Sequence, residues 1–257
     1  MKLTEFCDRL DEELRTGDWA DLDASANGLQ VGPEEADVEQ VAFCTDGVEE
    51  TFHMAADWGA DAIVVHHGIS WGGIERITGR QYGRIAPLVE NDVALYVSHL
   101  PLDGHPDLGN AAGVADLLDL ANRAPFGRVG PEHAGQQGRL PEPHTADELR
   151  DQLATDLSTG DQPVQVLDFG PAELEHVAIV TGDGSDYIDE ATAKGVDAVI
   201  MGEGKQKTYH EAQEAGLTVV LAGHYATETF GVRNLQSWVE EWDEPLETTF
   251  FDVPTGI

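Results

Sequence analysis

The sequence has few cysteines, and their placement limits the chemistry available to the protein. Only two of its 257 residues are cysteine. Cys7 and Cys44 form no C-x-x-C pair and provide no disulfide framework. We therefore expect two reduced thiols, and any metal site is expected to use ligands other than thiolate.

Basic residues are also scarce. Lys and Arg total 14 against 49 Asp and Glu, which gives a formal net charge of -35. Binding to nucleic acid or to an anionic membrane depends on clustered Lys and Arg, and the sequence shows no such cluster. Self-repulsion of this size is largely screened only at molar salt, where the Debye length is about 3 Å. We therefore expect a halophilic protein from a cytoplasm with very high salt.

Long apolar runs are absent as well. The first six residues reach an acidic side chain before any signal-peptide core, and no stretch approaches about 18 apolar residues. The sequence thus predicts a cytoplasmic protein with no membrane span. Its 257 residues, 41% of them hydrophobic, suffice for one large domain or two small ones.

Short apolar runs and amphipathic stretches alternate along the chain. Residues 41–44 and 62–65 are rich in apolar and β-branched side chains and predict buried strands. Residues 49–58 place Phe52, Ala55 and Ala56 on one helical face, and Gly59 should end that helix. This pattern predicts a βαβ unit.

The second half of the sequence repeats the first. Residues 41–47 resemble 177–183 and residues 59–68 resemble 195–204, in both cases 136 positions later. The alignment places His66 opposite Gly202 and His67 opposite Glu203.

A third match lies 125 positions apart. The predicted strand before His99 resembles the one before His224, and each histidine is followed four residues later by a carboxylate, Asp103 or Glu228. We attribute the difference between the offsets to an insertion in the first half, around residues 77–84.

These repeats predict an α/β fold of two related, intertwined lobes that arose by internal duplication, with a metal site between them. The first lobe should cover residues 1–125 and the second 126–257, and the C-terminal segment could pack on the first lobe. Residues 123–143 are rich in Gly and Pro and predict a loop or linker. Thr145 and Glu148 form a capping box that predicts the start of a helix.

Histidines and carboxylates gather at the predicted strand ends, where ligands of open α/β sheets bind. Imidazole and carboxylate ligands suit divalent Zn, Fe, Mn or Ni. Adjacent histidines point in different directions, so they serve two neighbouring ions more easily than one, and a carboxylate can bridge such a pair. The strand-end groups are His66, His67, His99, Asp103, His105, Glu203, His224 and Glu228.

Most of these groups also have a purely structural explanation. His66 and His67 could be a polar strand end, His99 and His105 could be ordinary loop residues, and Glu228 could be a first-turn carboxylate favoured by the helix dipole. His210 could reach the site or simply lie in a helix. The repeat favours a shared site, because it places several of these groups at equivalent strand ends.

Several phrases of the sequence resemble one known family. The sequence is similar to the Nif-three-like dinuclear-metal proteins, which are catalogued as GTP cyclohydrolase I type 2 homologues. The matching phrases occur in order over nearly the whole chain. They are residues 26–32 (Ala-Asn-Gly-Leu-Gln-Val-Gly), 65–68 (Val-His-His-Gly), 98–103 (Ser-His-Leu-Pro-Leu-Asp), 108–110 (Leu-Gly-Asn), 202–203 (Gly-Glu), 223–228 (Gly-His-Tyr-Ala-Thr-Glu) and 254–256 (Pro-Thr-Gly).

The resemblance implies an intertwined two-lobed fold and a ring-shaped homohexamer with two divalent metal ions per chain. The family's metal ligands fall on His66, His67, Asp103, His224 and Glu228. His99 corresponds to a nearby residue that is not a ligand, so we expect it to transfer protons, with Glu203 as a second candidate for this role.

One position departs from the family pattern. Lys205 and Lys207 follow Glu203 where many relatives are expected to have a histidine, so these lysines are candidates for contact with an anionic substrate.

The resemblance implies a metal-dependent hydrolase. In a GTP cyclohydrolase, metal hydroxide would attack C8 of GTP and formate would leave; another nucleotide or a pterin-like compound is also a candidate substrate. An alternative is a metal-binding or metal-delivery homo-oligomer without turnover. A nucleic-acid-binding ring is disfavoured by the charge.

Overall fold

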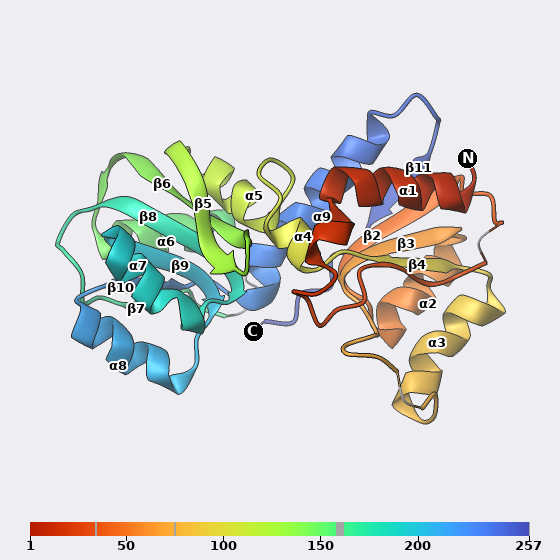
Figure 1. Cartoon of the computed structure of the whole chain (residues 1–257), viewed down its shortest axis with the longest axis horizontal. Helices are drawn as coiled ribbons and strands as arrows, with labels where there is room; N and C mark the ends of the chain where they lie inside the picture. The colour runs from red at the N-terminus through yellow and green to blue at the C-terminus, as the bar shows by residue number, and fades with distance from the viewer. Residues whose placement is uncertain (34, 75, 158–161, 257) are drawn as a thin grey trace. The chain divides into compact units, whose positions relative to one another are not determined.

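The computed structural model describes residues 1–33, 35–74, 76–157 and 162–256. The fold is mixed α/β and contains two sheets (Figure 1). The chain forms two compact units, the first from Met1–Leu102 and Val232–Val253, and the second from Asp103–Gly231 with the residues that follow Val253. Within the described residues, no helix combines the length and apolarity needed to cross a membrane.

The sheet of the first unit has the order β1-β4-β3-β2-β11. Strands β11, β2, β3 and β4 are parallel to one another, whereas β1 pairs with β4 in the antiparallel direction. The elements of this unit are α1 (Leu3–Leu14), η1 (Thr16–Trp19), β1 (Gly28–Val31), β2 (Gln40–Asp46), α2 (Glu49–Trp58), β3 (Ala62–His67), α3 (Arg80–Glu90), β4 (Ala94–Val97) and β11 (Glu247–Phe250). Helix α4 (Leu100–Asp103) and helix α9 (His224–Glu240) have residues in both units.

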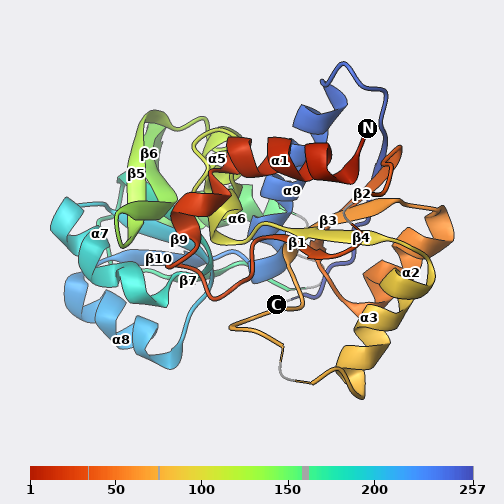
Figure 2. The same cartoon turned by 45° about the vertical axis from the view of Figure 1, so that its right-hand side comes forward.

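Alternation along the strands gives the first sheet two buried faces. Figures 1 and 2 show α2 and α3 on one face and α1 on the other. Phe52 of α2 and Leu88 of α3 belong to one apolar cluster with Ile63 and Val65 of β3. Tyr96 of β4 donates a 2.7 Å hydrogen bond to Asp11 of α1. The predicted helix over 49–58 and its end at Gly59, which has a φ of 85°, are confirmed.

The sheet of the second unit has the order β5-β6-β8-β9-β10-β7, with β8, β9 and β10 parallel. One face packs against α5, α6 and the start of α9, and the other packs against α7 and α8. The elements are α5 (Asn110–Leu117), β5 (Ala121–Val129), β6 (Glu132–His144), α6 (Ala146–Asp156), β7 (Gln165–Leu167), β8 (Leu174–Asp183), η2 (Ser185–Tyr187), α7 (Ile188–Lys194), β9 (Ala198–Glu203), α8 (Gln206–Ala215) and β10 (Thr218–Leu221).

The prediction of a loop or linker over residues 123–143 was wrong. This segment forms the antiparallel hairpin of β5 and β6 (Figure 2). Strand β5 lies at the edge of the sheet, where Pro125 is tolerated because only one side of the strand needs ladder hydrogen bonds. The helix predicted from the capping box is confirmed, because Glu148 N–H donates to Thr145 Oγ1 and Thr145 N–H donates to Glu148 Oε2.

Strand register supports the internal duplication. Val41 of β2 lies opposite Ala62 of β3, and Val177 of β8 lies opposite Ala198 of β9. Both residues of the second pair stand 136 positions after those of the first. The backbone pairing of the two sheets therefore follows the same alignment as the sequence repeat.

A turn at the start of a strand is repeated with the same hydrogen bonds. Asp61 Oδ2 accepts from the backbone N–H groups of residues 39 and 40, at 2.8 and 2.9 Å. Asp197 Oδ2 accepts from those of residues 175 and 176, at 3.0 and 2.9 Å. Each aspartate fixes the start of its neighbouring strand in the same way.

The third repeat needs a correction of one residue. Ala62 pairs with Ala94, and the equivalent Ala198 pairs with Thr218, so β4 and β10 are related by 124 positions rather than 125. His224 thus lies one residue further beyond its strand than His99 does. Gly223, with a φ of 98°, lies directly before this histidine.

The lobes predicted from the repeat, residues 1–125 and 126–257, have different boundaries from the compact units, because the repeat compares sequence and the units are defined by contacts. By contacts, residues 103–125 belong to the second unit and residues 232–253 to the first. The C-terminal segment packs on the first sheet, as the sequence suggested. Its strand β11 pairs with β2 from Glu247↔Gln40 to Phe250↔Phe43.

Candidate metal centre

Three histidines of the first unit lie together at the ends of two neighbouring strands. His66 and His67 are the last residues of β3, and His99 follows β4 by two positions. Their ring centroids are 4.5 Å apart for His66 and His67, 5.0 Å for His66 and His99, and 5.7 Å for His67 and His99. Each can offer one ligand atom, with all three atoms within 4.8 Å of one another, so these residues can hold a metal ion.

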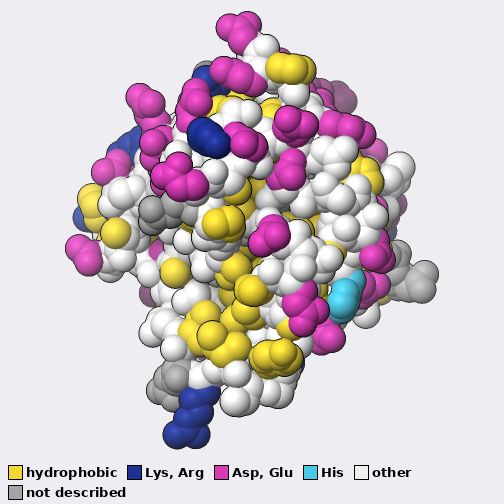
Figure 3. Space-filling view, turned by 90° about the vertical axis from the view of Figure 1, so that its right-hand side faces the viewer, with side chains coloured by type: hydrophobic (Ala, Val, Ile, Leu, Met, Phe, Trp, Pro, Cys, Tyr) yellow, Lys and Arg dark blue, Asp and Glu magenta, His cyan; other side chains and the backbone are white. Residues whose placement is uncertain are grey.

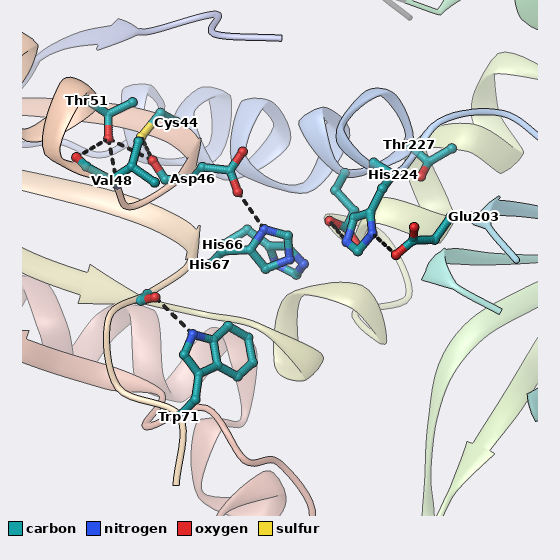
Figure 4. A network of polar contacts seen from close by, with 12 residues as sticks. Cys44, Asp46, Val48, Thr51, His66, His67, Trp71, Glu203, His224 and Thr227 are labelled. Carbon is teal, nitrogen blue, oxygen red and sulfur yellow. Dashed lines mark hydrogen bonds and ion pairs between the residues drawn. The ribbon is translucent and has the colours of Figure 1, made fainter. Parts of the chain in front are cut away.

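Hydrogen bonds at Nδ1 orient the first two rings. His66 is completely buried, and its Nδ1 lies 2.9 Å from the carbonyl oxygen of Ser98. His67 Nδ1 lies 2.8 Å from Asp46 Oδ1 (Figure 4). A carbonyl or ionised carboxylate only accepts, so each Nδ1 donates, and the neutral ring then has its lone pair on Nε2. This is the usual arrangement of a metal-binding histidine.

His99 is oriented by two residues, Asp23 and Asn27, that were not predicted to be site residues. Its Nδ1 lies 2.9 Å from Asp23 Oδ1, and its backbone N–H donates a 2.8 Å hydrogen bond to Asn27 Oδ1. Burial would raise the pKa of the Asp23 carboxyl, but the hydrogen bond and charge of His99, with further hydrogen bonds, lower that pKa to about 2. Trp71 contacts His99 edge-on, with 4.8 Å between ring centroids.

The loop after the histidine pair depends on Gln30. Its Oε1 accepts hydrogen bonds from the backbone N–H groups of Ile69 and Ser70 at 2.9 and 3.2 Å. A Cβ at Gly68 would lie 2.6 Å from Val97 Cγ2, so only glycine fits there. Gln30 and Asn27 both come from the phrase at residues 26–32, which therefore supports the histidine cluster without joining it.

In the second unit, His224 lies between two carboxylates. Its Nδ1 is 3.0 Å from Glu203 Oε1, and its Nε2 is 3.0 Å from Glu228 Oε2, one turn along α9 (Figure 4). Burial would lower the pKa of His224, but the hydrogen bonds and charges of Glu228 and Glu203 raise it to about 10. Glu228 is only 2% exposed. A divalent cation would compete with the proton for Nε2.

Asp103 is the last residue of α4 and is 6% exposed. Its Oδ1 accepts hydrogen bonds from Asn110 Nδ2 at 2.8 Å and from Thr181 Oγ1 at 3.0 Å. A nearly buried carboxylate held in this way is typical of a metal ligand with a hydrogen-bonded outer shell. Asn110 belongs to the phrase at residues 108–110, and its own Oδ1 accepts from the backbone N–H of Gly231.

A close backbone approach explains why the second sheet lacks the histidine pair. Gly202 is the repeat equivalent of His66. A Cβ at this position would lie 2.7 Å from His224 Cα and 2.8 Å from the carbonyl oxygen of Gly182. There is no space for a side chain, so this strand end can contribute only the following residue, Glu203.

Other sequence candidates have local partners. His105 Nδ1 accepts from the backbone N–H groups of residues 107 and 108, which gives it a role in its own turn. His210 packs edge-on against Tyr209 within α8. Lys205 Nζ lies 2.8 Å from Asp183, and Lys207 Nζ lies 2.6 Å from Asp186. Both lysines are thus in ion pairs, which weakens the expectation that they meet an anionic substrate.

The first unit offers the imidazoles of His66 and His67, and the second offers an imidazole and two carboxylates. Groups of both kinds fit a borderline divalent metal. His66 and His67 are each oriented by an acceptor at Nδ1, and Asp103 and Glu228 are nearly buried carboxylates. The roles of Asp23, Asp46 and Asn27 in orienting the histidines were not predicted from the sequence. The only signal for Asp46 was its position at the end of the strand beside β3.

Comparison with known proteins gives consistent results over the full length. A curated protein of Halobacterium salinarum is 55% identical over 257 residues, with both chains covered completely, and one of Escherichia coli K12 is 38% identical over 255 residues, 99% of each chain. Both are named GTP cyclohydrolase 1 type 2 homolog. The crystal structure of TTHA1606 from Thermus thermophilus superposes with a TM-score of 0.87, at 34% identity and with complete coverage of both chains.

The resemblance found in the sequence phrases is thereby confirmed. The family model described as Duf34/NIF3 (NGG1p interacting factor 3) matches residues 1–255. With this match and these relatives, the chain belongs to the Duf34/NIF3 family.

Proposed function

We propose that the protein is a metal-dependent hydrolase with two divalent ions per chain. His66, His67, Asp103, His224 and Glu228 would hold the ions, which could be Zn, Fe, Mn or Ni. The observation that carries the proposal is the orientation of the imidazoles, in which acceptors bind Nδ1 of His66 and His67 and favour Nε2 as the metal-binding atom. When bound, such ions lower the pKa of water and supply a nucleophile near neutral pH.

His99 is the candidate for proton transfer. With Nδ1 directed to Asp23, the neutral ring presents Nε2 as a base, and the carboxylate of Asp23 stabilises the positive charge that the ring gains. Trp71 covers one side of the imidazole. Glu203 was predicted to share this role, but its contact with His224 favours a different one, which is developed below.

The curated relatives' name supports GTP as the first substrate to test, with another nucleotide or a pterin-like compound as alternatives. A pocket of about 290 Å³ in the second unit could receive part of such a molecule. Glu203 lines it together with Gln162, Gln165 and Leu221. These side chains offer hydrogen-bond acceptors and amide groups suited to a neutral nitrogen heterocycle.

A homohexamer is proposed from the family resemblance, and surface composition of the first unit supports self-association. Large apolar side chains are exposed on α3 and the loop before it, among them Ile77, Tyr82 and Val89, which are 51%, 59% and 61% exposed. Exposed apolar patches commonly mark protein interfaces. Light scattering after size-exclusion chromatography tests the assembly; a monomer at all concentrations would contradict it.

The hydrolase proposal is tested by metal content and turnover. Elemental analysis should find about two ions per chain, because the donor set suits a two-metal site. Metal-loaded protein should release formate from GTP, and Asp103→Ala should abolish the release. Asp107→Ala is the matched control, since Asp107 is exposed and only four residues away. No release with Zn, Mn, Fe or Ni would remove GTP as substrate.

The second candidate is a metal-binding or metal-delivery protein without turnover. Solvent access favours it, because the side chains of His67 and His224 are 21% and 28% exposed and give ions a path to the ligands. Ready exchange of bound ions, without hydrolysis of any nucleotide or pterin tested, would support this alternative over the hydrolase.

A further inference from the structure

In each unit a carboxylate binds Nδ1 of one of the proposed metal ligands (Figure 4). In the first unit Asp23 binds Nδ1 of His99 as well, but His99 is the proposed proton-transfer residue and not a proposed ligand. In the first unit, Asp46 at the end of β2 lies opposite His67 at the end of β3, with 2.8 Å between Oδ1 and Nδ1. In the second, Glu203 at the end of β9 lies 3.0 Å from Nδ1 of His224, which follows β10. Neither carboxylate was predicted as a metal ligand.

The duplication alone does not account for these pairs. Asp183 lies opposite Glu203 in the second sheet, as Asp46 lies opposite His67 in the first. Asp183, however, has other partners: its Oδ2 lies 2.8 Å from Lys205 Nζ, and its Oδ1 accepts from the backbone N–H of Ser185 at 3.0 Å.

In the first unit the carboxylate ends β2 and the histidine ends β3. In the second unit the carboxylate ends β9, the repeat equivalent of β3, and the histidine follows the next strand, β10. The same repeat position has the imidazole in the first unit, as His67, and the carboxylate in the second, as Glu203. The residue types are exchanged, yet the contact between a carboxylate and Nδ1 recurs. Two different arrangements that reach the same contact indicate that the contact itself matters for the site.

The physical effect of such a contact is specific. A neutral imidazole exists as two tautomers, and a carboxylate that accepts from Nδ1 selects the one with its lone pair on Nε2. It also fixes the ring orientation and makes the ring a stronger ligand. His66 has the neutral carbonyl of Ser98 at this place, so His67 and His224 differ from it in having a charged partner.

We infer that Asp46 and Glu203 are positioning residues for metal binding, which act through His67 and His224. This inference rests on the proposed metal-dependent function. It also replaces, for Glu203, the expected role in proton transfer.

The test measures Zn²⁺ affinity of the full chain by competition with a chelator. Asp46→Asn and Glu203→Gln keep the size of each side chain but remove its charge, and the amide can turn its NH2 toward Nδ1 and favour the other tautomer. Each should weaken the binding of one ion about 10- to 100-fold, the usual effect of losing such a partner. Asp183→Asn is the matched control and should change affinity less than about twofold, because its carboxylate faces Lys205.

A spectroscopic readout separates positioning from general destabilisation. In the Zn²⁺-loaded wild type, ¹H–¹⁵N spectra should show slowly exchanging Nδ1–H signals for both His67 and His224. Asp46→Asn should remove the first signal only, and Glu203→Gln the second only. Circular dichroism checks that each variant is folded.

The possible results distinguish failure of the positioning role from failure of the proposed metal-dependent function. Wild-type protein that binds Zn²⁺, with variants that bind it equally well and retain both signals, would overturn the positioning role and leave the proposed function intact. Wild-type protein that binds neither Zn²⁺ nor another of the proposed ions would overturn both.

Discussion

At the scale of single residues, the site is defined by which nitrogen of each imidazole forms a hydrogen bond with the protein. Acceptors from the protein bind Nδ1 of His66, His67, His99 and His224. The partners are a carbonyl in one case and carboxylates in the others. Metal-binding residue types can be recognised in a sequence, but the choice of nitrogen depends on neighbours that lie 21 to 76 residues away in the chain.

Gly202→Ala tests the close approach behind the asymmetry of the repeat. The added Cβ would meet the backbone of His224 and Gly182, which cannot rotate away as a side chain can. We expect a loss of about 1–3 kcal/mol in the free energy of unfolding, the usual cost of overpacking. Chemical denaturation measures it. Gly17→Ala serves as the control, because nothing lies within 4 Å of its Cβ position, and equal losses in both variants would contradict the steric argument.

Thiol reactivity tests the interpretation of the two cysteines. Burial raises the pKa of both Cys7 and Cys44 to about 12, so at pH 8 both are protonated thiols rather than reactive thiolates. We expect neither to be alkylated by iodoacetamide at pH 8 in the folded protein, and both to be alkylated in denaturant, as counted by mass spectrometry. Rapid alkylation of either cysteine in the folded protein would contradict the burial of its thiol.

At the scale of elements, the duplication extends from strand register to individual hydrogen bonds. Asp61 and Asp197 accept the same two backbone N–H groups at the start of the adjacent strand in each unit. Such a turn is fixed by local backbone geometry, so it can persist after the surrounding side chains diverge. The strand ends, in contrast, have diverged to imidazoles in one unit and a carboxylate in the other.

Asp61→Ala and Asp197→Ala should therefore have similar effects. Each removes a carboxylate that accepts two backbone hydrogen bonds, and we expect each to lower the free energy of unfolding by about 1–2 kcal/mol. The double variant should lose the sum, since the two sites share no partner. Asp57→Ala, on the exposed side of α2, should stay within about 0.5 kcal/mol of wild type. Clearly unequal losses at the two aspartates would argue against equivalent roles.

At the scale of the whole molecule, acidity dominates. The net charge is -35, and Figure 3 shows Asp and Glu side chains spread over the face in view with few Lys or Arg among them. Charge of one sign at this density destabilises a compact chain unless salt screens it. The acidity thus concerns the conditions under which the protein is stable rather than the chemistry of its histidines.

Stability should accordingly rise with salt. Between about 0.1 M and 2 M KCl the Debye length falls from about 10 Å to below 3 Å, so most repulsion between exposed carboxylates disappears. We expect the midpoint of thermal unfolding to rise by several degrees. NaCl at equal ionic strength should give the same curve, because screening depends on ionic strength. A midpoint that does not change with salt would contradict the halophilic hypothesis.

The alternation of strands and helices, the two repeated segments and the candidate ligands could all be predicted from the sequence, because they depend on local periodicity and on residue type. Prediction from the sequence failed over residues 123–143, where Gly and Pro suggested a linker although the segment pairs as a hairpin. It also misplaced the third repeat by one residue, since only strand pairing reveals the extra position before His224.

The groups that orient the histidines, and the reason why one strand end has no imidazole, could be identified only from the folded structure. Asp46 acquires its role because β2 and β3 are parallel neighbours, and Gly202 acquires its role because the backbone before His224 passes close to it. Both depend on distances between segments far apart in the chain. Local sequence patterns contain no information about such distances, whereas residue type and spacing are sufficient to suggest a metal ligand.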